Sequence, residues 1–149
     1  MSQDQFLLDI KSTLDKIAKD KADELGVRMI DLDNTVETQE LFSSEDDAIV
    51  WEYGTLAPDP RDPLYVLTFN IGGRTVKDSA NYTMLGINGT VQELFEPCKR
   101  LEIKNYSGVV ESEIRGFLNI TQVIVSPQQY DKVSGVRMMS VTARAMRLA

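Results

Sequence analysis

The sequence has no histidine and only one cysteine, Cys98, among its 149 residues. Without histidine, the Ser-His-Asp and Cys-His catalytic arrangements, histidine-ligated zinc sites and histidine general bases are excluded. A single cysteine excludes an intrachain disulfide and a multi-cysteine zinc site, and this usage is typical of proteins that mature in a reducing cytosol. Cys98 follows Pro97 and falls near the apolar face of a predicted helix, which favours a packing role over a reactive thiol.

Long hydrophobic runs are also absent. No apolar stretch approaches the roughly 20 residues that span a bilayer, and the polar start from Met1 to Gln5 does not resemble a signal peptide. We therefore expect a soluble protein that is not secreted and has no membrane partner. A hydrophobic content of 42% over 149 residues suits one globular domain, residues 1–149.

Acidic residues outnumber basic ones, 23 to 16, which gives a net charge of −7. The excess belongs to residues 1–63, with 16 acidic and 6 basic side chains, whereas residues 64–149 have 7 acidic and 10 basic ones. Such an asymmetry suits a subunit whose ends face oppositely charged partners, including a neighbouring copy. An uneven but solvated surface is the alternative.

Motifs for metal and nucleotide sites are incomplete. The acidic run that begins with Asp31 and Asp33 lacks the later ligands and the glycine of a calcium loop. Gly72 and Gly73, followed by Arg74 and Lys77, lack the G-x-x-x-x-G-K-[ST] frame of a phosphate loop. No metal, cofactor or catalytic residue is predicted, although two of the 23 acids could still converge in a hydrolase.

Helical periodicity appears twice. An N-terminal helix is predicted from the first residues to Gly26, with an apolar stripe on one side. That stripe comprises Phe6, Leu7, Ile10, Leu14, Ile17 and Leu25. A second helix is predicted to begin at Asp78 or Ser79, and Gly86 and Gly89 either bend or split it.

Alternation with a period of two predicts two hairpins. The first joins a strand around residues 49–53 to residues 64–71, which Gly72 and Gly73 should end, and the second joins residues 116–125 to 135–147. Trp51 is expected on the buried face with Tyr65, Leu67, Phe69 and Ile71, and the last strand should bury Met139, Val141, Ala143 and Ala145.

These elements predict an α+β domain with an antiparallel sheet of about four strands, covered by the N-terminal helix and the second helix, in the order α-β-β-α-β-β. Weaker patterns leave open a short strand near residues 27–30 and a short edge strand within residues 101–106. Between the first two strands, Pro58, Pro60 and Pro63 predict a stiff loop, which is either a simple turn or a preorganised docking contact.

The order of the elements resembles that of bacteriophage tail terminator (tail completion) proteins. The resemblance runs over most of the chain, through AIVWEYGTL, LYVLTFNI, SANYTMLGINGTVQELF, GFLNITQVIV and GVRMMSVTARAMR. The chain departs from that family's pattern in the long segment 27–47 and between the second helix and the last hairpin. The resemblance implies a homo-oligomeric ring, typically a hexamer, that caps the tail tube, stops its growth and presents a joining surface to the neck.

The implied partners are further copies of the chain, the tail tube, the sheath protein where one exists, and the neck or connector protein. No sequence-specific nucleic acid is expected, while passage of DNA through the ring is compatible with the resemblance. The location would be the neck-proximal end of the tail in the virion, after assembly in the host cytoplasm. Another ring-forming tail or neck component, such as a tail tube subunit, is the first alternative, and a small carboxylate-dependent enzyme is the second. The predicted partner or subunit interface comprises Pro58, Asp59, Pro60, Arg61, Arg74 and Lys77.

Overall fold

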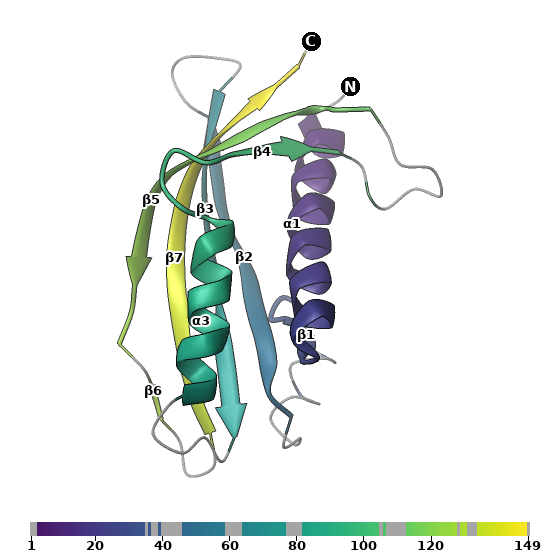
Figure 1. The fold of residues 1–149 in the computed structure, drawn as a ribbon. Coiled ribbons are helices and arrows are strands. Elements are labelled where there is room, and N and C mark those ends of the chain that lie inside the picture. The colour runs from purple at the N-terminus through teal and green to yellow at the C-terminus, as the bar shows by residue number, and fades with distance from the viewer. Residues whose placement is uncertain are drawn as a thin grey trace.

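The computed structural model describes residues 3–34, 36, 39, 46–58, 64–76, 82–104, 106, 113–127, 129–130 and 134–148. The elements are α1 (Gln3–Leu25), β1 (Arg28–Asp31), β2 (Ala48–Pro58), β3 (Leu64–Val76), α3 (Tyr82–Leu94), β4 (Arg100–Ile103), β5 (Gly116–Val125), β6 (Gln129–Tyr130) and β7 (Ser134–Arg147). Figure 1 shows long strands β2, β3 and β7 running side by side, with α1 and α3 in front of them.

The sheet has the strand order β1-β2-β3-β7-β5-β4, and β6 pairs with β7 beside this path. Both predicted hairpins are present, because β2 pairs with β3 and β5 pairs with β7, both antiparallel. The prediction of four strands was too low, and its order was incomplete. The described residues contain seven strands, because β1 joins β2 in parallel, β4 joins β5, and β6 joins β7. Strands of two to four residues carry too short a pattern to stand out in a sequence.

The third strand does not end at its glycines as predicted. β3 continues through Gly72 and Gly73 to Val76 and stays paired with β7 along its length. A Cβ atom on Gly72 would overlap the carbonyl oxygen of Arg137, and one on Gly73 would lie 2.8 Å from Cγ2 of Ile87 on α3. The two glycines therefore allow neighbouring elements to approach closely instead of marking a turn.

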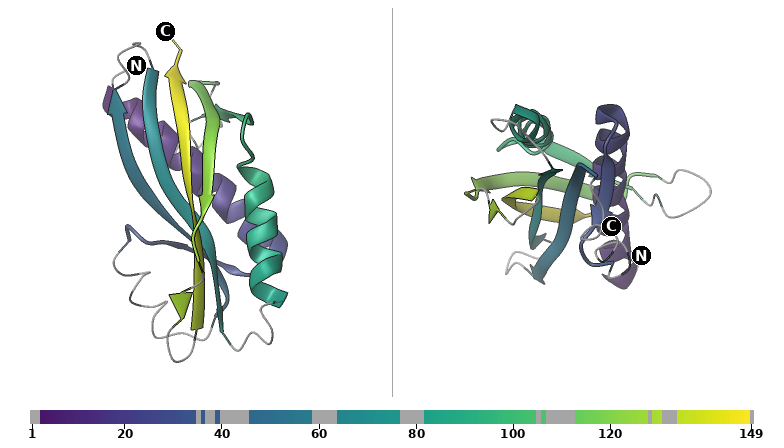
Figure 2. Two further views of the ribbon diagram at one scale, coloured as in Figure 1. Left: turned by 90° about the vertical axis from the view of Figure 1, so that its left-hand side faces the viewer. Right: turned by 90° about the horizontal axis from the view of Figure 1, so that it is seen from below.

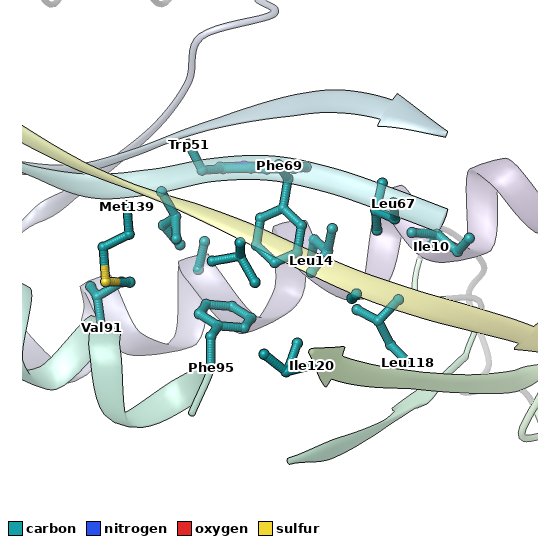
Figure 3. Packing of buried hydrophobic residues seen from close by; sticks show 14 of the residues in the cluster. Ile10, Leu14, Trp51, Leu67, Phe69, Val91, Phe95, Leu118, Ile120 and Met139 are labelled. Carbon is teal, nitrogen blue, oxygen red and sulfur yellow. The ribbon is translucent and has the colours of Figure 1, made fainter. Parts of the chain in front are cut away.

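The core lies between the two helices and one face of the sheet. Figure 3 shows Trp51, Leu67, Phe69 and Met139 from the strands pointing toward Ile10, Leu14, Val91 and Phe95 from the helices and their ends. Trp51 is 1% exposed and pairs with Ile71 in the register of β2 and β3. The predicted buried faces of β2, β3 and β7 are confirmed, because all their named residues except Tyr53 of β2 are buried.

The second helix is continuous. α3 runs from Tyr82 to Leu94 without a break at Gly86 or Gly89, both of which are exposed, with open space where a Cβ atom would lie. The helix ends before Cys98, so the prediction that this cysteine packs on an apolar face was wrong. Cys98 is exposed and has a φ of 71°, and its main-chain N–H donates to the carbonyl oxygen of Ile120 at 2.8 Å.

Both helices pack on the same face of the curled sheet, as the two views of Figure 2 show. On the opposite face, Ile30, Ala48 and Val50 form a small second cluster with Leu32, Val136 and Met138. No helix of the described residues is long and apolar enough to cross a membrane.

Candidate functional site

The predicted interface is only partly described. Asp59, Pro60, Arg61 and Lys77 lie outside the described residues, so their positions stay a prediction. Pro58 is the last residue of β2 and pairs with Tyr65 of β3, so the strand reaches further into the proline-rich loop than expected. Edge positions tolerate proline because one side of such a residue needs no main-chain donor, but here Pro58 closes the hairpin.

Arg74 is not an exposed charge at a strand end. Because β3 continues to Val76, Arg74 lies within the strand and is 3% exposed. Its Nη1 donates to the main-chain oxygen of Asp46 at 2.9 Å. Beside it, the N–H of Val76 donates to Oδ1 of Asp47 at 2.8 Å. The contribution of Arg74 to any interface would therefore be indirect, through holding the chain before β2 against β3.

Basic side chains converge at the end of the sheet that also holds the chain's two ends (Figure 1). Register places Asn119 opposite both Arg100 and Arg144, and Gly116 opposite Arg147. With Arg115 and Lys104 these residues form what we call the basic end: Arg100, Lys104, Arg115, Arg144 and Arg147. Two acids of the described residues, Glu102 and Glu113, lie in the same segments, so positive charge prevails.

The basic end includes an exposed cation beside an aromatic ring. The Arg100 Cζ atom lies 3.7 Å from the centre of the Phe117 ring, on the sheet face that the helices leave uncovered. A guanidinium over a ring keeps its charge and its donors directed outward. This arrangement suits contact with carboxylates or phosphates of a partner.

The opposite end of the sheet has a more balanced charge. Asp31, Asp33, Asp46 and Asp47 flank β1 and the start of β2, where the sequence is most acidic. Arg28 lies among them, with Nη1 at 3.8 Å from an oxygen of Asp46. The charge asymmetry of the sequence thus becomes a basic end and a mixed end in space.

A cavity of about 440 Å³ lies between α1, β1 and the chain beyond β4. Its lining comprises Ser12, Asp15, Lys16, Lys19, Met29, Asp31, Asn34 and Tyr106. Hydrogen bonds fix its walls, because Ser12 Oγ accepts from the Tyr106 N–H at 3.1 Å, and Thr13 Oγ1 accepts from the Lys104 N–H at 3.1 Å. This concave site is the one among the described residues with clustered acids.

Lys11 organises the charges at the base of this cavity. Its Nζ donates to Asp31 Oδ2 at 2.7 Å, lies 3.7 Å from Asp15 Oδ1 and is 4.5 Å from the centre of the Trp51 ring. Burial raises the pKa of Asp15 above its ordinary value, the charge of Lys11 opposes that shift, and the charge of Asp31 adds to it. Asp15 is thus the acid whose ionisation the fold disfavours.

The chemistry open to this cluster is limited. Asp31 is already engaged on both oxygens, because Oδ1 accepts from the Asp33 N–H at 2.9 Å and Oδ2 from Lys11. Asp33 in turn accepts from the Tyr53 N–H at 2.8 Å. Among the described residues, no group of three or more acids, cysteines or histidines is placed to hold a metal ion. The cluster mainly ties α1, β1 and β2 together.

Sequence reasoning missed this cluster. The spacing of Lys11 and Asp15 signals a helical ion pair, but nothing local indicates that Asp31, twenty positions after Lys11, completes it. A scan against protein-family models found no match, and neither did a search of curated proteins.

Proposed function

We propose that this chain is a structural protein of a bacteriophage tail, which forms a ring, caps the tail tube and joins it to the neck. The proposal comes from the order of elements in the sequence, and the α+β fold with both expected hairpins is compatible with it. The six predicted interface residues, Pro58, Asp59, Pro60, Arg61, Arg74 and Lys77, belong to this proposal, with Arg74 in an indirect role.

The observation that favours an assembly protein most is the one-sided sheet. Both helices pack on one face, so no described helix covers the other face, and the long strands β2, β3 and β7 display alternate side chains there. A protein that works by contact needs such surface, whereas a small-molecule enzyme needs an enclosed pocket. The 23-residue α1 also favours a tail terminator over the more strand-rich tail tube subunit.

Assembly can be tested directly. The purified chain should form cyclic rings of uniform size, at high concentration or on added tail tubes, when examined by light scattering and negative-stain electron microscopy. Tubes polymerised with the chain present should be shorter and closed at one end. Stacked tubes of the chain alone would favour a tube subunit, and a strict monomer that leaves tube length unchanged contradicts the proposal.

A carboxylate-dependent enzyme is the second candidate, and the cavity beside α1 favours it. Asp15 has a raised pKa in a concave site, which is a property of general acids. The candidate ranks second because the nearest carboxylate, Asp31, already accepts hydrogen bonds on both oxygens. Hydrolysis of chromogenic glycosides, esters or phosphates that Asp15→Asn abolishes and Asp20→Asn preserves would reverse this ranking.

A further inference from the structure

The strand β5 has an edge that its neighbours cover only in part. Its first half pairs with β4 through residues 116–119, and Ile120 exchanges hydrogen bonds with the main chain of Cys98 and Lys99. Beyond Ile120, β5 still pairs with β7 on one side, but no described strand pairs with its other side. We call residues 121–125 on that side the open edge.

Main-chain groups at the open edge point outward at alternate residues. The N–H of Ser126 donates to the carbonyl oxygen of Met138 at 2.9 Å, and Ile124 faces Ser140 in the same register. Even-numbered residues here therefore bond to β7, so the N–H and C=O groups of Val123 and Val125 point away from the sheet. Unpaired strand edges of this kind are templates for another strand unless charge, proline or a cover protects them.

The side chains around the open edge carry no such protection. The segment Gln122 to Val125 has no charge and no proline, and Ile124 is 54% exposed on the face away from the helices. On the helix side, Val123 lines a groove of about 270 Å³ together with Gly89, Phe95 and the exposed Glu93 and Glu96 of the α3 end. An added strand would contact Ile124 with one set of side chains and this groove with the other.

The chain carries a second open edge of matching length. β1 ends the sheet on its other side, and Arg28 and Leu32 donate to the main chain of β2 at 3.2 and 2.8 Å. Its outward main-chain groups therefore belong to Met29 and Asp31. Arg28 on β1 has the charge that complements Glu93 and Glu96 beside β5.

We propose that the open edge of β5 takes the β1 edge of a second copy of this chain, so that neighbouring sheets join through main-chain hydrogen bonds. This contact uses two different surfaces and is head-to-tail, the type that closes into rings. It rests on the proposed ring function and names the surfaces that build the ring. Each copy contributes one donor edge and one acceptor edge, which leaves none unpaired after closure.

Proline substitutions separate the two edges. Val123→Pro removes one outward N–H of β5, and Met29→Pro removes one of β1, whereas Val123→Thr and Met29→Leu keep those groups and serve as controls. Under conditions where the natural chain assembles, each proline variant alone should be monomeric by light scattering, and each control should assemble.

A mixture of the two proline variants gives the sharper result. Each retains the edge that the other lacks, so an equimolar mixture should form dimers and nothing larger. Assembly of Val123→Pro into normal rings overturns the proposal while leaving the ring function standing, and a mixture that stays monomeric overturns β1 as the partner edge. A natural chain that never assembles, with or without tail tubes, overturns both.

Amide hydrogen exchange tests the same contact without any substitution, in case a variant fails to fold. The amides of Val123, Val125 and Met29 should exchange quickly in the monomer and slow by about tenfold or more in the ring. Ile124, already bonded to β7, is the internal control and should change little. Equal exchange of Val123 in monomer and ring overturns the proposal.

Discussion

At the scale of single residues, burial and charge are decided by a few contacts of Lys11 and Trp51. One ammonium group neutralises Asp31, approaches Asp15 and lies over the indole, and it thereby connects α1, β1 and β2. The Trp51 Nε1 atom is buried and finds no hydrogen-bond partner within the described residues. The indole therefore stabilises the fold by packing rather than by a polar contact.

Replacement of Trp51 by alanine should lower the free energy of unfolding by about 3 to 5 kcal/mol, because it empties the largest buried site in the core. Urea unfolding followed by circular dichroism measures the change. Tyr82→Ala, at a strongly exposed aromatic residue on α3, is the matched control and should cost far less. Since Trp51 is the one tryptophan, native fluorescence with a water-exposed maximum would contradict its placement.

Asp15 makes stability depend on pH in a defined direction. Its pKa is raised in the folded protein, so the native state holds this proton more tightly than the unfolded state does. The Asp15 contribution therefore favours folding below the unfolded pKa of 3.8 and is lost as pH rises through the higher folded pKa. The melting temperature of Asp15→Asn, relative to the natural chain, should rise between pH 3 and neutral pH.

Thermal melts in a pH series test this dependence. Asp20→Asn removes an exposed carboxylate from the same helix and is the control. A difference between Asp15→Asn and the natural chain that is constant across the series would show that burial does not perturb Asp15.

At the scale of elements, glycine has two opposite roles in this fold. In β3, Gly72 and Gly73 allow β7 and α3 to approach, whereas in α3, Gly86 and Gly89 face open space. The same residue type is therefore required in the strand and costly in the helix. The continuous course of α3 through its glycines follows from the packing of Met84, Ile87 and Val91 on the sheet.

Alanine at these positions should act with opposite sign. Gly86→Ala and Gly89→Ala should each stabilise the protein by about 0.5 to 1 kcal/mol, because the helix gains propensity without a clash. Gly72→Ala should destabilise it, because the new Cβ atom overlaps the Arg137 carbonyl oxygen and must displace β7. Chemical denaturation of the three variants measures the effects, and destabilisation by Gly89→Ala would contradict the open position of its Cβ.

At the scale of the whole molecule, charge is separated along the long strands. The basic end collects residues from β4, β5, β7 and their flanks, although the chain as a whole has a net charge of −7. Local fields of one sign steer partners even when the net charge is opposite. A basic end on every subunit would give a ring one basic face for an acidic partner.

The basic end should retain the protein on a heparin matrix at low salt, despite its acidic pI of about 4.6. Arg100→Glu combined with Arg144→Glu should move it to the flow-through. Lys16→Glu with Lys19→Glu changes the net charge equally, but on α1, where both lysines already pair with aspartates, and should have a smaller effect. Salt above about 0.2 M should weaken retention, since screening acts over about 8 to 10 Å.

Equal elution of the two double variants would show that net charge alone controls binding. Tube capping assays with the same pair would then indicate whether the basic end contributes to docking. Melting temperatures of both variants, which should stay near that of the natural chain, separate docking from folding.

The sequence by itself determined which residues are buried in the long elements. Alternation in β2, β3 and β7 and helical spacing in α1 place Trp51, Phe69, Val141 and Ile10 in the core, because a side chain's direction follows from its position in a regular element. It also determined the two hairpins and the absence of histidine chemistry. These are local properties, readable from neighbours a few positions apart.

Only the tertiary structure decided the edges and the polar contacts. The parallel pairing of β1, the edge strand β4, the burial of Arg74, the exposure of Cys98 and the Lys11–Asp31 ion pair all join residues distant in sequence. Short strands and single charges have no period of their own, so their environment is set by whichever element packs beside them. For the same reason the open edge of β5 becomes visible only when β4 is seen to end at its midpoint.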